Sequence, residues 1–261
     1  MLSLVRLFGE VLLLSLVIVV LLYVFEFILQ RILEKRNLKI GDEIRVLLEK
    51  VLNSELSDYE RAFAASELGR QTMNDSERQV VSRVLRLVLR NKHLPEAVRA
   101  SSAGALGEID RKRNKRIFKL IARNKDENEY VRMPSIINLG LLETSLKTIQ
   151  NITKDNSEKE KIRLLSITVI VRYSNRIQNA EFLKKNLIEN INTPQSVRTH
   201  ASKMIQILKN PEGIERSNEE IVEFLKIEII EDQNLSEGIK FFARAVIHLF
   251  DTNRNLLLDY D

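Results

Sequence analysis

One sequence pattern recurs six times along this 261-residue chain, and it restricts the fold more than any other feature. Each copy carries a basic residue, here called the anchor, near the start of a helical stretch, as in YERAFAASELG at Tyr59 and AVRASSAGALG at Ala97. The six anchors are Arg61, Arg99, Arg132, Arg163, Arg198 and Lys240, and neighbouring anchors lie 31 to 42 residues apart. A period of that length predicts a stack of repeated helical hairpins.

Other positions keep the same register. Three residues after the anchor the side chain is always small: Ala64, Ser102, Ser135, Ser166, Ala201 and Ala243. Seven residues after the anchor it is always aliphatic: Leu68, Leu106, Leu139, Ile170, Ile205 and Ile247. Both positions lie on one face of a helix, where small side chains let neighbouring hairpins pack closely.

Each anchor helix has an amphipathic partner helix before it in the chain. The partner helices are predicted at residues 42–53, 76–92, 112–124, 144–153, 179–189 and 218–232. Gly (8), Pro (4) and aromatic residues (6%) are scarce and Trp is absent, which disfavours sheet sandwiches and Gly-rich nucleotide-binding folds. We therefore predict an all-α chain in which residues 42–250 form about six hairpins, followed by a tail at 251–261.

The repeat resembles the short type of HEAT repeat, whose signature VRxxAAxALGxI is nearly matched by VRASSAGALGEI at residues 98–109. The resemblance implies a right-handed α-solenoid. It also implies that an acid three residues before the anchor pairs with anchor arginines between adjacent repeats, on the inner side of the superhelix. This ladder would contain Asp58, Glu96, Glu129 and Glu160 with Arg61, Arg99, Arg132, Arg163 and Arg198.

The N-terminal segment predicts a membrane anchor. Residues 11–25 carry no charge and the apolar run extends to residue 29, long enough to cross a bilayer once. The alternative is a cleaved signal peptide, but no cleavage site of small residues follows the run. We expect an anchor at 1–30, with residues 11–29 in the membrane, and a basic linker at 31–41. Basic residues follow the run, so the positive-inside rule puts the N-terminus outside and the solenoid in the cytoplasm. The linker residues expected to contact anionic lipid are Arg31, Lys35, Arg36 and Lys39.

Composition argues against an enzyme. The chain has no cysteine, so disulfides, thiol nucleophiles and iron–sulfur clusters are excluded. Its three histidines, His93, His200 and His248, fall in different repeats without neighbouring carboxylate motifs. No nucleotide-binding or hydrolase motif is present. We expect no catalytic residue, cofactor or metal; His200 alone is expected to line an inner groove.

Charge is distributed unevenly. Residues 83–119 hold eleven basic and three acidic residues, whereas residues 210–261 hold twelve acidic and five basic ones. The basic stretch allows an alternative function as a membrane-associated nucleic-acid binder. Phe118 is the one aromatic residue there and is expected to be buried, which favours a protein-interaction scaffold with a protein partner or the subunits of a membrane complex.

Apolar residues on the inner helices suggest where a partner binds. Positions one, two, five and nine after the anchor are expected to point away from the hairpin core. The apolar residues predicted to form a partner-binding strip are Met133, Ile137, Leu141, Leu164, Leu165, Phe241, Phe242 and Leu249. A contiguous apolar strip on a surface usually marks an interaction site. The alternative is that rotated helices bury these residues in the core.

Overall fold

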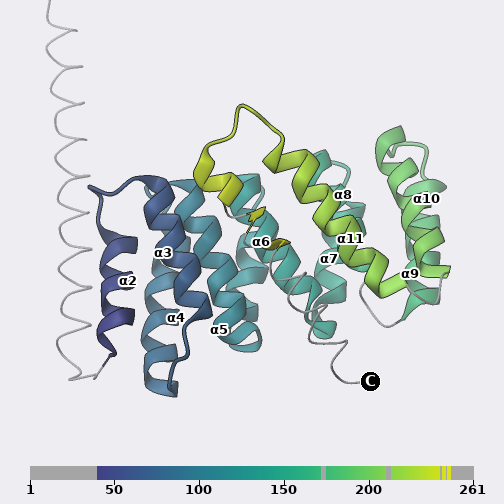
Figure 1. The fold of residues 1–261 in the computed structure, drawn as a ribbon. Helices are drawn as coiled ribbons and strands as arrows, with labels where there is room; N and C mark the ends of the chain where they lie inside the picture. The colour runs from purple at the N-terminus through teal and green to yellow at the C-terminus, as the bar shows by residue number, and fades with distance from the viewer. Residues whose placement is uncertain (1–39, 172–174, 210–212, 242, 245, 248–261) are drawn as a thin grey trace, which may run out of the picture.

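The computed structural model describes residues 40–171, 175–209, 213–241, 243–244 and 246–247, and in this part of the chain every regular element is a helix (Figure 1). The all-α prediction is therefore confirmed for the described residues. The helices form a row of antiparallel pairs, an arrangement compatible with an α-solenoid.

Each pair consists of an outer helix followed by an inner helix, which carries the anchor. In units one to five the outer helices are α2 (Asp42–Leu52), α4 (Asp75–Arg90), the second half of α5 (Glu96–Arg123), α7 (Leu146–Lys154) and α9 (Arg176–Leu183). In unit six α11 (Gly213–Leu225) is the first helix of the pair. The inner helices are α3 (Asp58–Arg70), the first half of α5, α6 (Glu129–Gly140), α8 (Glu160–Ile170) and α10 (Gln195–Lys209). A 3₁₀ turn, η1 (Glu143–Ser145), precedes α7, and π-helical turns extend α9 (η2, Lys184–Ile188) and α11 (η3, Lys226–Ile230). We number the pairs units one to six.

Helix α5 contains a sharp kink that divides unit two from unit three. Asp110 has extended backbone angles (φ −163°, ψ 86°) inside an otherwise helical stretch. Its side chain accepts a hydrogen bond from the backbone N–H of Arg113 at 2.9 Å, as a residue that caps a helix N-terminus does. Asn114, which is buried, donates to the backbone carbonyls of Leu106 and Asp110 at 2.9 Å each. These hydrogen bonds satisfy backbone carbonyls that the kink leaves without a partner within the helix.

The turn between the two helices is the same in all six units. Eight residues before each anchor lies an Asn or Asp. Its side chain accepts a hydrogen bond from the backbone N–H two residues later, and its backbone carbonyl accepts one from the backbone N–H three residues later. The six residues are Asn53, Asn91, Asn124, Asp155, Asn190 and Asp232. Asn and Asp favour such turns because their short side chains replace a backbone acceptor. This local chemistry fixes the hairpin in every unit.

Close approach between neighbouring inner helices explains the repeat glycines. A Cβ at Gly107 would overlap the side chain of Asn138, and one at Gly140 would overlap Val169. Asn138 cannot give way easily, because it donates to the carbonyls of Ala103 (3.1 Å) and Pro134 (3.0 Å). Glycine therefore lets units two, three and four stack at short distance.

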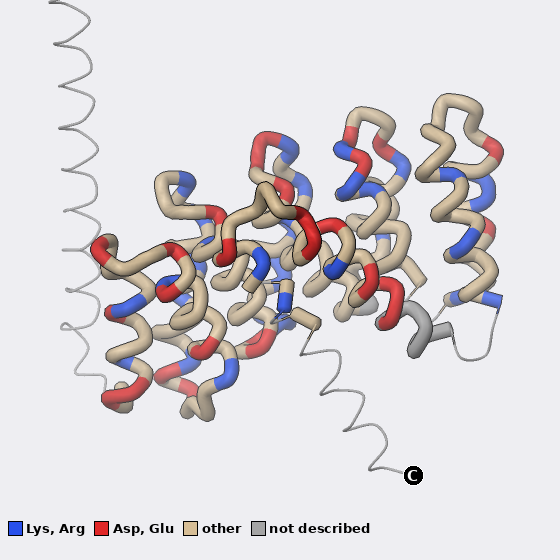
Figure 2. Tube along the Cα trace, turned by 45° about the horizontal axis from the view of Figure 1, so that its top comes forward, with Lys and Arg blue, Asp and Glu red and all other residues tan. Residues whose placement is uncertain are grey.

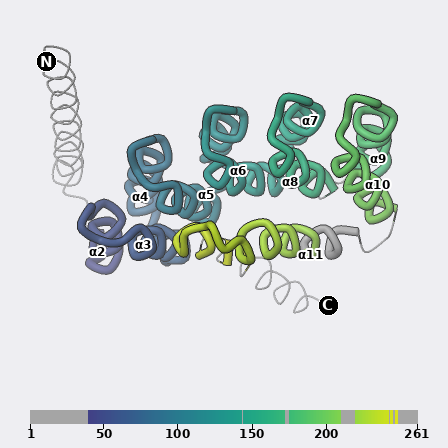
Figure 3. Tube along the Cα trace, turned by 90° about the horizontal axis from the view of Figure 1, so that it is seen from above, coloured from purple at the N-terminus to yellow at the C-terminus, as the bar shows by residue number. Residues whose placement is uncertain are grey.

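The sixth unit departs from the predicted row of hairpins. Seen from above, α11 turns back and runs along the side of the row formed by the inner helices, toward α3 (Figure 3). It packs against α8 and α10. Ile221 and Leu225 of α11 are fully buried in this position.

The predicted membrane helix is corrected by the structure. Within the described ranges, no helix combines the length and the apolar composition needed to span a bilayer. The physical reason is that charged residues recur along these helices, as Arg78, Arg83 and Arg90 do in α4. The assignment as a single-pass membrane protein with a cytoplasmic solenoid is corrected with it. Residues 1–39, which include the predicted anchor and its lipid-contacting basic residues, lie outside the described residues.

Candidate functional site

The anchor arginines hold the hairpins together. In the first four units the guanidinium Nε of Arg61, Arg99, Arg132 or Arg163 donates to the backbone carbonyl ten residues earlier, at 3.1 Å each time. That carbonyl lies near the end of the outer helix, where carbonyls lack partners within the helix. Each anchor thus ties the end of its outer helix to the start of its inner helix.

Two anchors also bind the next unit. Arg99 forms a two-pronged ion pair with Glu127, and Arg132 forms one with Glu158 at 2.8 and 2.5 Å. All four side chains are buried, with at most 4% of each exposed. Buried ion pairs with this geometry are costly to break, because removing one partner leaves a desolvated charge. They fix units two, three and four relative to one another.

The acids predicted for this ladder do not take part in it. Asp58, Glu96, Glu129 and Glu160 are each the first residue of an inner helix, and none forms an ion pair with an anchor. A carboxylate at this position interacts favourably with the helix dipole. Asp58, Glu96 and Glu160 are exposed, and Glu129 pairs with Lys159 at 3.4 Å. Glu127 and Glu158 lie two residues earlier, inside the turn. Sequence reasoning missed them because the corresponding turn residue in the other units is Leu56, Leu94, Thr193 or Leu235.

The remaining anchors have weaker partners. Arg163 is buried, its Nη2 has no hydrogen-bond partner, and the same holds for the hydroxyl of Thr193, the turn residue of the next unit. Arg198 donates to Gln195 at 2.7 Å, while its Nε has no partner. The residue ten before Arg198 is Ile188, which ends the π-helical turn η2. The arginine ladder therefore weakens at unit five, where the outer helix ends differently.

The C-terminal segment, residues 219–241, crosses the inner helices from unit five back to unit one. We call the surface it covers the inner face. Lys203 of α10 pairs with Glu220 at 2.6 Å, and Lys161 of α8 pairs with Glu228 at 3.0 Å. Burial raises the pKa of Tyr130 on α6, and nearby Asp232 contributes to that rise. The contacts thus follow the units in reverse order.

At unit one the segment ends on aromatic residues. The ring of Phe241 lies 5.4 Å from the ring of Tyr59, edge to face, and 5.5 Å from that of Phe63. Such ring contacts add to the burial of apolar area. A Cβ at Gly238 would lie 2.7 Å from the Cβ of Ala97, so the backbone can approach α5 here only because the residue is glycine. Close backbone approach indicates a fitted contact.

Electrostatics of the inner face match the acidic segment. Burial acts to lower the pKa of Lys161, but its hydrogen bond to Glu228 and nearby acidic groups leave that pKa above its ordinary value. The segment itself is rich in acids, which concentrate along α11 and η3 (Figure 2). Basic inner-face side chains therefore meet an acidic helix.

The predicted apolar strip is only partly exposed. Met133, Ile137 and Leu165 are buried in the core, so they do not offer a surface in this fold. Leu141, Leu164 and Phe241 are half-buried, and Phe241 belongs to the covering segment. The reason is that these positions face inward in other units too: Ala62 and Ser66, which occupy the positions of Met133 and Ile137 in unit one, are also buried. The predicted residues Phe242 and Leu249 lie outside those whose side chains are described.

A small cavity remains open on the inner face between α8 and α10. It has a volume of about 390 Å³ and is lined by Leu164, Gln195, Ser196, Thr199, His200 and Lys203. His200 lies 2.8 Å from the hydroxyl of Thr168, and burial lowers the pKa of its imidazole. His93 lies in an exposed turn, and His248 is not described. Among the described residues no group of three or more His, Asp or Glu side chains could hold a metal ion.

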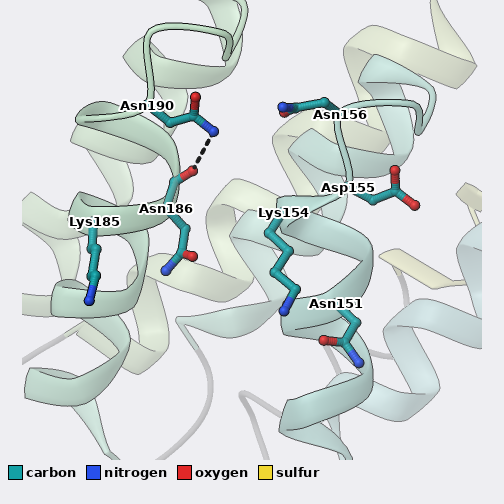
Figure 4. A pocket seen from close by; sticks show the side chains of 7 residues that line it. All are labelled: Asn151, Lys154, Asp155, Asn156, Lys185, Asn186 and Asn190. Atoms are coloured by element: carbon teal, nitrogen blue, oxygen red, sulfur yellow. Dashed lines mark hydrogen bonds between the residues drawn. The ribbon is translucent and has the colours of Figure 1, made fainter.

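A second opening lies between the outer ends of units four and five (Figure 4). It measures about 620 Å³ and is lined by Asn151, Lys154, Asp155, Asn156, Lys185, Asn186 and Asn190. Asp155 is already engaged, because hydrogen bonds from Lys125 and Ser157 hold the pKa of its carboxyl at about 2. The other side chains diverge across an open, polar surface. This opening has no feature that selects a ligand.

Part of the basic stretch takes part in the stacking. Arg86 donates to Asn114 at 2.7 Å and Arg111 to Asn138 at 3.1 Å, both across neighbouring units. Lys115 donates to the backbone carbonyl of Thr144 at 3.2 Å. Lys112 and Arg116 are exposed on the outer side. The basic residues thus divide between contacts within the fold and exposed positions, which are Arg83, Arg90, Lys92, Lys112, Arg113 and Arg116.

No protein-family model, no curated protein and no solved structure matches this chain. The inner face and the segment that covers it are therefore interpreted from their own geometry.

Proposed function

We propose that this protein is a non-enzymatic protein-interaction scaffold: a HEAT-like α-solenoid whose inner face binds a helical segment of a protein partner. One observation carries the proposal. The inner face already holds the chain's own residues 219–241, which include most of α11 and all of η3, through ion pairs at units four and five and aromatic contacts at unit one. Helix-in-groove binding is a common mode of protein recognition.

Repeat architecture supports this proposal. The same turn closes every unit, anchor arginines join units two to four, and such stacks build extended surfaces rather than enclosed pockets. Both openings described above are shallow and lack a cluster of catalytic side chains. A scaffold is the function that such a surface suits best.

Affinity capture with charge-reversed variants tests the proposal. Full-length wild type, Lys161→Glu/Lys203→Glu and Lys112→Glu/Arg116→Glu are immobilised and exposed to extract from cells that express the protein. The first variant reverses two inner-face cations and the second reverses two exposed outer cations, so the charge change is matched. We expect one set of proteins to bind wild type and the outer variant but not the inner variant.

The same experiment evaluates the nucleic-acid alternative. Capture that is lost with the outer variant and after nuclease treatment, and that falls steeply with salt, would replace the scaffold by a nucleic-acid binder. Circular dichroism of each variant checks that the helical fold is retained.

A further inference from the structure

We propose that the inner face recognises an acidic amphipathic helix, and that residues 219–241 are a tethered copy of this ligand which a partner must displace. The inference rests on the proposed function and adds the chemistry of the partner and the control of access. It follows from what the covering segment presents to the inner face.

The apolar side of the segment has a regular spacing. Ile221, Leu225 and Ile229 follow one another at intervals of four residues, and each is 0% exposed. This spacing puts the three side chains on one face of a helix. A competing helix needs apolar side chains at the same spacing.

The acidic side supplies the second requirement. Glu220 and Glu228 each precede one of these apolar residues, and each meets a lysine from a different unit, Lys203 and Lys161. The two lysines lie on separate inner helices, α10 and α8, so a pair of acids two helical turns apart bridges both. A helix with this acid spacing selects the inner face over an uncharged apolar groove.

The segment is suited to displacement. The lysine side chains of its two ion pairs are 54% and 34% exposed, and exposed pairs contribute little to stability. Tyr59 and Phe63, which receive Phe241, remain 44% exposed each. The covalent tether adds to the buried apolar contacts of the segment, because it gives the segment an effective concentration in the millimolar range. An untethered partner helix must therefore overcome this competition.

The test measures binding of one probe to two forms of the full-length protein. The probe is a fluorescent synthetic peptide with the sequence of residues 213–241. The released form carries Gly238→Val and Phe241→Asp, which add side-chain volume against Ala97 and remove the aromatic contact with unit one. Neither substitution alters the inner face. We expect the peptide to bind the released form at least ten-fold more tightly than wild type.

Specificity is tested with matched changes. A peptide carrying Glu220→Gln and Glu228→Gln should bind the released form at least five-fold more weakly. Lys161→Ala in the released form should weaken binding by a similar factor, whereas Lys112→Ala should not. Equal binding to wild type and released protein, or equal binding of both peptides, would overturn the inference.

A second variant covers the case in which the released form fails to fold. A protease site inserted at residues 210–212 allows the folded full-length protein to be cut after purification. The C-terminal fragment should then dissociate on dilution and free the inner face for the peptide. A fragment that stays bound at every dilution would contradict displacement by a partner.

Sedimentation of the released form distinguishes a second copy from a foreign partner. A released form that dimerises and excludes the peptide would show that the occupant is the segment of another copy, which overturns the partner proposed here. If the peptide binds neither form while capture still depends on Lys161 and Lys203, the tethered-ligand inference fails and the proposed scaffold stands. If capture is also independent of these lysines, both fail.

Discussion

Units two, three and six share the same turn between their two helices, yet their hairpins are used differently. In units two and three the anchor reaches back to its own outer helix and forward to the next turn, through Arg99–Glu127 and Arg132–Glu158. In unit six the same turn at Asp232 produces a hairpin that lies across the inner face. The difference teaches that the turn specifies a hairpin, whereas buried ion pairs and close glycine contacts specify stacking.

The largest expected effect tests the buried ladder. Arg132→Met leaves the carboxylate of Glu158 buried without a partner and should lower the free energy of unfolding by about 3–5 kcal/mol. Arg61→Met is the control, because the corresponding turn residue of unit two is Leu94 and only the bond to the Val51 carbonyl is lost. Its cost should be about 1 kcal/mol. Chemical denaturation followed by circular dichroism measures both, and equal losses would show that the ion pair does not hold the stack.

A second effect depends on pH. Burial raises the pKa of the Glu108 carboxyl to about 7, although Arg70 and Arg111 act to lower it. The unfolded chain therefore releases this proton at lower pH than the folded chain does, and stability should fall as pH rises from about 4.5 to 7. The loss is up to about 3 kcal/mol, and Glu108→Gln should remove it.

Unfolding free energies at pH 5 and pH 8 check this expectation. The Gln variant should be more stable than wild type at pH 8 and close to it at pH 5. Parallel pH profiles of the two proteins would place the titration elsewhere. Glu108 lies beside Gly69 of unit one, so this effect belongs to the stacked units and not to unit six.

Close packing gives a smaller effect. Gly107→Ala should lower the free energy of unfolding by about 2 kcal/mol, because the added Cβ overlaps an Asn138 side chain held by hydrogen bonds. Gly41→Ala is the control, since the nearest atom to its added Cβ is 3.5 Å away. Thermal denaturation of both variants compares them. A Gly107→Ala protein as stable as the control would mean that the units are less closely stacked.

The smallest effect separates the two regions most directly. Asn124→Ala removes the turn bond of unit three and should lower global stability by about 1 kcal/mol. Asp232→Ala removes the equivalent bond of unit six and should leave global unfolding unchanged, while hydrogen exchange of residues 219–241 increases. Global destabilisation by both substitutions would indicate that unit six is an integral part of the stack.

Sequence reasoning reached the hairpins but not their final arrangement. The anchor, the small position after it and the amphipathic partner helices are local features, so their periodicity predicts each pair. The pairing of Arg99 with Glu127 depends on a turn residue that is acidic in only two units. A pattern defined by what all six repeats share does not include this residue. The sequence did contain one signal for unit six, the excess of acidic residues after residue 210. Acidic side chains pack favourably against a surface that carries basic ones, as Lys161 and Lys203 do here.

The contact of Phe241 with Tyr59 and Phe63 also has a consequence for biosynthesis. It joins residues near opposite ends of the described chain, and closing such a long loop costs more conformational entropy than forming a hairpin. Hairpins close first, and units one to five are synthesised before residues 219–241 leave the ribosome. A nascent chain therefore exposes its inner face until residues 219–241 have emerged from the ribosome. During that period a partner helix can bind without competition, so assembly during translation is favoured over assembly afterwards.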